Sequence, residues 1–372
     1  MRSDVFHPIR LFAVLLAASV PSVLPARDLP AGLQPYFQPP AEFAGKLGAY
    51  RSPLRFYNGR EVKSATDWPE RRAELLAKWH EVMGPWPEVL SNPQLEVLTT
   101  TNREGFIQHK VKVQYGASQF HEGYLLVPPG GGKFPAVLVP FYDAETSVGL
   151  AGKPWRDFAR QLTKRGLVTL SIGSPGGSAY EPDVAGAQCQ PLSYHAYVSA
   201  NCANALANLP QVDAKRIGVM GHSYGGKWAM FSACLNEKFA CAAWSDPGIA
   251  FDEKRPSVNY WEPWYLGMEP GLTRKRGVPT AGNPRTGAYK VMVEQGMDLP
   301  EFQSLMAPRP FFVSGGSEDI PSRWVALNHP IGVYQLLGLE NRVGMSNRAH
   351  HDPTEESNEL VYRFFVHHLM GH

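Results

Sequence analysis

The sequence has no strong excess of charge of either sign. Its 36 lysines and arginines nearly balance its 34 acidic residues, which leaves a formal net charge of +2. A protein that binds nucleic acid or an anionic membrane through its charge carries a clear basic excess or a dense basic patch. The basic run from Arg274 to Arg276 is short and is typical of a solvated loop. We therefore expect no nucleic-acid partner.

Long apolar runs are scarce beyond the N-terminus. Arg2 and Arg10 precede an uncharged apolar run from Leu11 to Leu24, and Pro25-Ala26 follows it. Basic residues, a short apolar run and a small residue are typical of an export signal, and the run is too short for a comfortable membrane span. We expect residues 1–26 to be a signal peptide and the mature protein to be periplasmic or secreted, with no membrane attachment.

Cysteine and clustered metal ligands are also few. The four cysteines are Cys189, Cys202, Cys234 and Cys241, and no C-x-x-C or Cys/His cluster occurs. This absence excludes the common zinc and redox motifs, so we expect neither a metal nor another cofactor. Four cysteines allow three disulfide pairings, between which the sequence does not choose, and buried free thiols are the alternative.

What the sequence does contain is an alternation of short apolar strands and helical segments after residue 134. We expect strands at 136–141, 167–172, 217–220, 241–244, 310–314 and 342–346, with helices between most of them. Such alternation predicts a mostly parallel sheet covered by helices on both faces. The chain has 372 residues, 44% of them hydrophobic, which is ample material for such a core.

The segment before this alternation differs in character. Residues 67–82 are expected to form a helix that begins after Asp67, and 109–115 and 122–127 to form antiparallel strands. We therefore expect an N-terminal extension with a packed helix at 27–104 and an α/β catalytic domain at 105–372. Residues 247–300 are irregular and rich in aromatics, as in an insertion or lid.

One stretch organises the rest of the chain. The sequence RIGVMGHSYGGKW, residues 216–228, contains a short strand, then G-x-S-x-G around Ser223, then a helix. This pattern resembles the nucleophile elbow of α/β-hydrolases, in which a strained turn exposes a serine hydroxyl. Gly221 and Gly225 allow the tight turn and close packing of the helix. The Tyr224 amide, at the helix N-terminus, is then placed to stabilise an oxyanion.

A serine nucleophile needs a base and an acid that orients the base. In α/β-hydrolases these follow the serine in the chain. Asp319 follows a predicted strand in a glycine-rich turn, and His350 and His351 lie between the last strand and the last helix. We therefore predict Ser223, His351 and Asp319 as the catalytic residues. His350 is the alternative base and Asp246 the alternative acid.

Several segments narrow the resemblance to carbohydrate esterases, and in particular to glucuronoyl esterases. Ser223 is followed four positions later by Lys227, as in that family, where the lysine contacts the sugar acid. The sequence WSDPG around Asp246 lies where some members carry their acid as glutamate. His351 begins an H-D-x-T sequence like that around the family's histidine. The approach to the late strand, residues 299–310, is also similar.

The resemblance implies further site residues. Lys227 is expected either to bind a substrate carboxylate or hydroxyl or to be a solvated lysine of its helix. Tyr224 stands where the family carries an arginine of the oxyanion hole. After the strand 136–141 we expect a backbone amide of Tyr142 or Asp143 to complete that hole. In the insertion, Trp261 and Trp264 are expected either to stack on sugar or to form the core of a small cap.

Taken together, these features predict an exported α/β-hydrolase that cleaves a carboxylic ester, small or polysaccharide, by an acyl-enzyme mechanism. The favoured substrate is a xylan-type acetyl or glucuronoyl ester, as in acetyl xylan esterases and glucuronoyl esterases. One alternative is a prolyl-oligopeptidase-like serine peptidase, although the chain has no repeats for a propeller. The other is an inactive hydrolase fold used for binding. The oligomeric state is left open.

Overall fold

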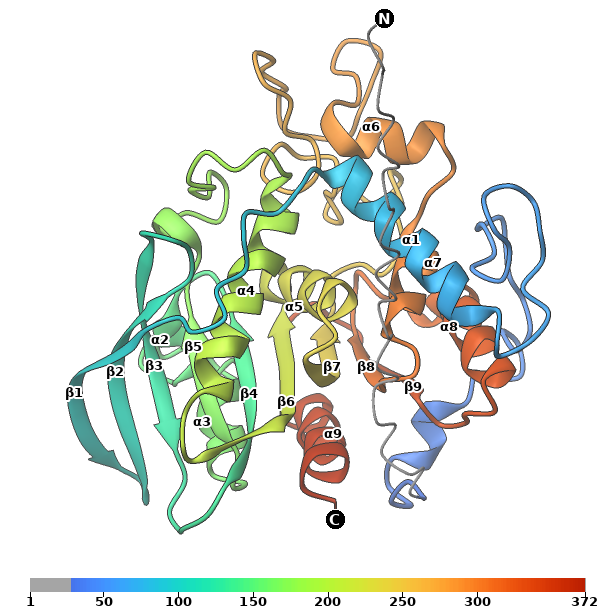
Figure 1. The fold of residues 1–372 in the computed structure, drawn as a ribbon. Coiled ribbons are helices and arrows are strands. Elements are labelled where there is room, and N and C mark those ends of the chain that lie inside the picture. Colours follow the sequence, from blue (N-terminus) through green and yellow to red (C-terminus); the bar gives the residue numbers. More distant parts are fainter. Residues whose placement is uncertain (1–27, 372) are drawn as a thin grey trace, which may run out of the picture.

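The computed structural model describes residues 28–371, which build one central sheet flanked by helices (Figure 1). The signal peptide expected at residues 1–26 lies outside the described residues. Within the described part of the chain, no helix combines the length and apolarity needed to cross a bilayer.

The sheet has nine strands in the order β1-β2-β3-β5-β4-β6-β7-β8-β9. Pairing is antiparallel from β1 through β3 to β5 and parallel from β5 onward. The mostly parallel sheet predicted from the sequence is thus confirmed. The strands are β1 (Leu95–Arg103), β2 (Phe106–Gln114), β3 (Phe120–Val127), β4 (Phe134–Pro140), β5 (Val168–Ile172), β6 (Val212–His222), β7 (Phe239–Ser245), β8 (Phe311–Gly315) and β9 (Val343–Asn347).

Helices cover both faces of this sheet, because side chains of the central strands alternate between two cores. In β4, Val137 and Val139 pack with Phe158 of α3 and Phe364 of α9, whereas Leu138 belongs to the core of the other face, with α1, α4 and α5. The helices are α1 (Trp68–Met83), α2 (Ala144–Ser147), α3 (Phe158–Thr163), α4 (Pro191–Ala207), α5 (Tyr224–Leu235), α6 (Gly287–Glu294), α7 (Leu299–Gln303), α8 (Trp324–Leu336) and α9 (Glu355–Phe365).

Strand β1 and the short helices α2, α6 and α7 were not expected from the sequence. Strand β1 lies in the predicted N-terminal extension, and the boundary proposed at residue 104 falls in the hairpin between β1 and β2. Almost all of β1 is exposed, so it has no buried face and no apolar alternation to reveal it. Helix α6 lies in the segment 247–300 that the sequence left irregular, and α7 begins at the end of that segment. Both are short and both pack on α1, so their surroundings stabilise them more than any periodic pattern of their own.

The four cysteines are all buried and unpaired. Burial raises the pKa of the Cys189 thiol to about 11 and that of Cys202 to about 12, which disfavours the reactive thiolate. Of the two sequence-based interpretations, the structure has the buried free thiols.

Candidate active site

The turn around Ser223 connects β6 to α5 and has a strained backbone. Ser223 has φ 57° and ψ −119°, a conformation that costs a non-glycine residue roughly 1–3 kcal/mol. The turn is packed too tightly for side chains on its glycines. A Cβ at Gly221 would lie 2.1 Å from the Gly225 carbonyl oxygen, and one at Gly225 would lie 2.3 Å from that of Pro140. This strand–turn–helix geometry is the one predicted from G-x-S-x-G.

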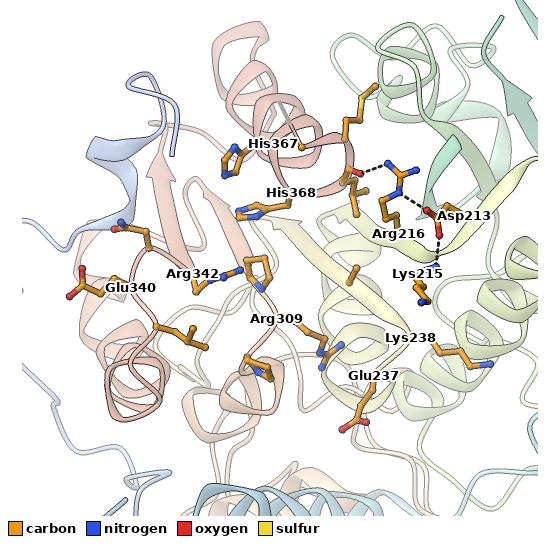
Figure 2. A pocket seen from close by; sticks show the side chains of 18 of the residues that line it. Asp213, Lys215, Arg216, Glu237, Lys238, Arg309, Glu340, Arg342, His367 and His368 are labelled. Atoms are coloured by element: carbon orange, nitrogen blue, oxygen red, sulfur yellow. Dashed lines mark hydrogen bonds and ion pairs between the residues drawn. The ribbon is translucent and has the colours of Figure 1, made fainter. Parts of the chain in front are cut away.

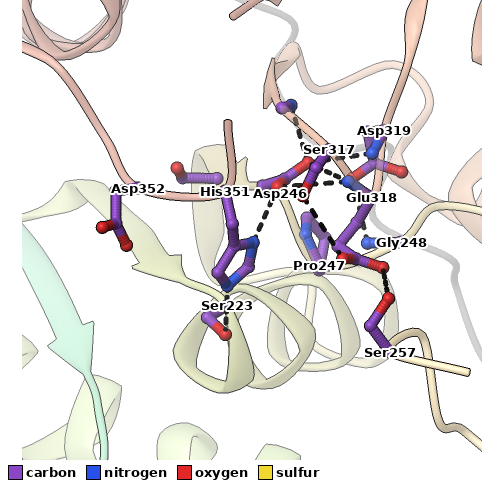
Figure 3. A network of polar contacts seen from close by, with 12 residues as sticks. Ser223, Asp246, Pro247, Gly248, Ser257, Ser317, Glu318, Asp319, His351 and Asp352 are labelled. Carbon is purple, nitrogen blue, oxygen red and sulfur yellow. Dashed lines mark hydrogen bonds and ion pairs between the residues drawn. The ribbon is translucent and has the colours of Figure 1, made fainter. Parts of the chain in front are cut away.

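The Ser223 hydroxyl meets the imidazole of His351 at the carboxyl ends of the parallel strands (Figure 3). His351 Nε2 lies 2.8 Å from Ser223 Oγ, and its Nδ1 lies 2.7 Å from Oδ2 of Asp246. His351 follows β9 and Asp246 follows β7, so three separate strand ends supply the three groups. His350, the alternative base, has an exposed side chain and takes no part in this line. The arrangement can pass a proton from the serine to the imidazole.

Asp246 is held as a buried carboxylate. It is fully buried, and its Oδ1 accepts hydrogen bonds from the amides of Gly316 at 2.6 Å and Asp319 at 2.8 Å. Burial by itself raises its pKa, but the hydrogen bonds from His351 and the Asp319 amide outweigh burial, so the pKa of Asp246 lies below its usual value. The carboxylate is therefore charged at neutral pH and can orient the imidazole and stabilise its protonated form.

Asp319 occupies a different place from the one predicted. Its carboxylate accepts a hydrogen bond from the amide of Gly248 at 2.9 Å (Figure 3) and another from the amide of Ile249 at 2.6 Å. Burial, together with the charge of Asp246, raises the pKa of Asp319 to about 7. The structure thus places Asp246, the alternative, against the imidazole. Both aspartates follow strands, and only the paths of the loops decide which carboxylate reaches His351.

Arg348 is a site residue that the sequence reasoning missed. Its guanidinium donates to the carbonyl oxygens of His351 at 2.6 Å and Asp352 at 2.8 Å, and also to that of Ser314 at 2.7 Å. It therefore ties the loop that carries the histidine to the end of β8. The sequence signal was slight: an arginine three positions before His351 in the same loop.

His222 was also missed, although it directly precedes the serine. It is buried, its ring lies 4.8 Å from that of His351, and its Nδ1 is 3.1 Å from Ser245 Oγ. Burial, together with the neighbouring His351 ring and the Arg348 charge, holds the pKa of His222 well below its usual value, so the ring is neutral. It forms an uncharged wall beside the imidazole.

The two tyrosines predicted for the oxyanion hole lie together beside Ser223. Tyr224 is the first residue of α5, and its ring lies 4.9 Å from that of Tyr142, which follows β4. Burial raises the pKa of the Tyr142 hydroxyl, and the neighbouring Ser223 side chain and Tyr224 amide act in the opposite direction. The phenol of Tyr142 therefore lies close to the serine, in addition to the backbone amide of Tyr142 or Asp143 that was expected from the sequence.

The side chains predicted to bind substrate are largely enclosed. Lys227 is 4% exposed and its ammonium donates to the Pro247 carbonyl oxygen at 2.7 Å. Its burial lowers its pKa to about 8, against the opposing effect of nearby carboxylates that include Asp319. Trp261 is fully buried against Tyr289, and Trp264 is 8% exposed. The two indoles thus have the burial of a cap core and do not present an open surface for sugar.

A hollow in the described chain lies away from this site, at the amino ends of the parallel strands (Figure 2). It has a volume of about 870 Å³, and Arg216, Arg309, Arg342 and Glu237 are among the residues that line it. Arg216 pairs with Asp213. None of the residues predicted for the site lines this hollow. In residues 28–371, no cluster of three or more His, Cys, Asp or Glu side chains could hold a metal ion.

Comparison with known proteins shows which class of proteins the chain resembles. The family model described as "Esterase FrsA-like" matches residues 80–245, a segment that contains Ser223 and ends just before Asp246. A curated relative, 2,6-dihydropseudooxynicotine hydrolase of Paenarthrobacter nicotinovorans, is 24% identical over 207 residues. That match covers 54% of this chain and 49% of the relative, so the chain matches about half the relative's length.

Solved structures match over more of the chain. A glucuronoyl esterase from Solibacter usitatus has a TM-score of 0.67 at 19% identity, with 86% of this chain and 98% of that chain covered. A putative acetyl xylan esterase from Bacteroides fragilis has a TM-score of 0.55 at 15% identity, with 84% and 79% covered. The chain has the α/β-hydrolase fold. The predicted resemblance to glucuronoyl and acetyl xylan esterases is confirmed, and the matches support the prediction of a carboxylic ester hydrolase.

Proposed function

We propose that this protein is a serine-dependent hydrolase of carboxylic esters, with Ser223 as nucleophile, His351 as base and Asp246 as the orienting acid. The observation that carries the proposal is the unbroken line of two hydrogen bonds, 2.8 and 2.7 Å long, from Ser223 Oγ through His351 to Asp246. The assignment of the acid departs from the sequence prediction of Asp319, whose carboxylate is bonded to two loop amides.

The chemistry follows from this line. Ser223 Oγ attacks the ester carbonyl while His351 Nε2 accepts its proton, and His351 then returns that proton to the leaving alkoxide. The acyl group remains on Ser223 as an ester. Water, deprotonated by the same nitrogen, attacks this ester. The bond to Ser223 Oγ then breaks, the acid is released, and His351 Nε2 gives the proton to Ser223 Oγ. Asp246 accepts the Nδ1 proton in its hydrogen bond throughout, so the Nε2 lone pair points at the serine.

Charge on the carbonyl oxygen needs donors fixed before the reaction begins. We assign this role to the Tyr224 amide, at the N-terminus of α5, and to the Tyr142 hydroxyl, which lies close to the Ser223 side chain. A substrate oxygen entering beside Ser223 would accept both hydrogen bonds. Tyr142 and Tyr224 thus supply the function for which glucuronoyl esterases use an arginine after their serine.

The favoured substrate class is an ester on a carbohydrate, of the xylan-type acetyl or glucuronoyl kind. This choice is supported by the structural likeness to a glucuronoyl esterase and a putative acetyl xylan esterase. The expected export signal agrees with a polysaccharide substrate outside the cytoplasm, and we propose a periplasmic or secreted location.

The test is hydrolysis of p-nitrophenyl acetate, acetylated xylan, a benzyl glucuronate ester and a Gly-Pro anilide by the wild type and Ser223→Ala. We expect turnover of at least one ester, abolished in Ser223→Ala. Turnover of the anilide alone would replace the proposal with a peptidase. Silence on all four substrates, with no labelling of Ser223 by a fluorophosphonate, would favour an inactive binding protein.

A further inference from the structure

Both proposed oxyanion residues are attached to one buried serine, Ser174. It follows β5, and its backbone amide donates to the Tyr142 carbonyl oxygen at 3.2 Å. Its hydroxyl lies 3.0 Å from the hydroxyl of Tyr224. Since β5, β4 and β6 are neighbours in the sheet, Ser174 connects three adjacent strand ends. Ser174 and Tyr224 are fully buried, so water does not compete for these bonds.

The hydrogen atoms of this network have one favourable arrangement. Ser174 uses its single hydroxyl proton to donate to the Ser178 carbonyl oxygen at 2.6 Å, so towards Tyr224 it acts as an acceptor. The Tyr224 hydroxyl therefore donates to Ser174 Oγ, and its remaining lone pairs face His195 Nε2 at 2.9 Å.

His195 completes the network as a neutral donor. It is fully buried, and burial lowers its pKa to about 3. Its Nδ1 has no hydrogen-bond partner in the described chain. A proton on that nitrogen would be an orphaned buried donor, so the proton belongs on Nε2. Each hydrogen bond in the network is therefore donated in the same direction: His195 donates to Tyr224, Tyr224 to Ser174, and Ser174 to the Ser178 carbonyl oxygen.

We propose that Ser174 is a positioning residue that holds the oxyanion hole in register with Ser223. The inference rests on the proposed function and adds a residue to it. The bond between the Tyr224 and Ser174 hydroxyls holds the first residue of α5, whose amide is one proposed oxyanion donor. The Ser174 amide holds the backbone of Tyr142, whose hydroxyl is the other proposed donor. A small misplacement of such donors costs up to about a hundredfold in rate.

The test uses Ser174→Ala and Tyr224→Phe, each of which removes one hydroxyl from the network. For each variant we expect kcat on the best ester to fall about ten- to a hundredfold, with KM within about twofold. The double variant should lose little more than the worse single variant, because both changes break the same bond. Thr163→Val is the matched control. It removes a buried hydroxyl of α3 that contacts Thr169 of β5, the strand that Ser174 follows, and should leave kcat unchanged.

A second measurement separates this inference from the choice of substrate. The rate at which a fluorophosphonate labels Ser223 depends on the oxyanion donors and not on the natural ester, so it should fall in parallel with kcat. Wild-type protein that labels well but hydrolyses no ester would overturn the proposed substrate class, while slow labelling of the variants would still support Ser174. Labelling of Ser174→Ala at the wild-type rate, or an equal loss in folded Thr163→Val, would overturn the inference.

Discussion

The backbone amide of Asp319 donates a hydrogen bond to Oδ1 of Asp246 at 2.8 Å, while the Asp319 side chain turns away to the amides of Gly248 and Ile249. One aspartate thereby supports the other. Asp246 faces His351, and Asp319 braces the loop that follows Asp246. The two aspartates, which the sequence offered as rivals for one role, have different roles in the proposed site.

Replacement of each aspartate by asparagine should therefore have unequal effects. Asp246→Asn loses the charge that orients His351, and kcat should fall by about 10⁴-fold, as for the loss of the acid in other serine triads. Asp319→Asn keeps its backbone donor and one side-chain acceptor, so its kcat should fall far less and its loss should be mainly in stability. Initial rates and thermal unfolding of both variants test this. A larger loss of kcat in Asp319→Asn would restore the sequence-based assignment.

The free energy of unfolding should depend on pH through the ionisation of Asp319. Its folded pKa of about 7 lies above the ordinary value of 3.8, so folding favours the protonated form. The stabilisation this provides is present at low pH and is lost as pH rises through about 7. The free energy of unfolding of the wild type, relative to Asp319→Asn, should therefore fall between about pH 4 and pH 7. Urea unfolding across this range measures it. Parallel curves for the two proteins would contradict the prediction.

Removal of the Tyr142 hydroxyl should slow the chemical step. Tyr142→Phe keeps the ring that packs on Tyr224 and deletes one proposed oxyanion donor, so kcat should fall about 10²-fold with KM little changed. Tyr180→Phe is the matched control, since Tyr180 is exposed and contacts Trp264 and Arg276. Steady-state kinetics on one ester compare the two. Similar rates for both variants would show that the backbone alone forms the hole.

Replacement of Arg348 by lysine should disturb the histidine loop despite conserving the charge. The guanidinium donates to carbonyl oxygens of residues 314, 351 and 352 from three separate nitrogens, whereas lysine carries all its donors on one nitrogen and cannot span the same positions. We expect kcat to fall about tenfold or more because His351 is less well placed. The control is Arg363→Lys, an exposed arginine of α9 paired with Glu359, which should keep full activity. Equal activity in the two variants would remove Arg348 from the site.

The sequence by itself determined the layers of the fold and the turn at Ser223. The apolar runs of β4 to β9 and the spacing of Gly221 and Gly225 around Ser223 are local patterns, and local patterns can be recognised in the sequence without knowledge of the fold. The same holds for His351, which lies in a loop between the last strand and the last helix. Strand β1 was not predicted because it has no buried face, and the short helices α6 and α7 were not predicted because they are too short to show a clear periodic pattern.

Only the tertiary structure decided which groups meet. Asp246 and Asp319 follow the neighbouring strands β7 and β8. The paths of the loops decide which of the two carboxylates contacts His351, and they bring Asp246 within hydrogen-bond distance although it lies 105 positions away in the chain. The phenol of Tyr142 and the Ser174 network depend likewise on the order β5-β4-β6, which the sequence does not state. Lys227 and Trp261 carry polar or aromatic groups suited to a sugar, and burial in the folded chain directs both toward the core. Sequence patterns report what a residue can do, whereas long-range packing selects its partner.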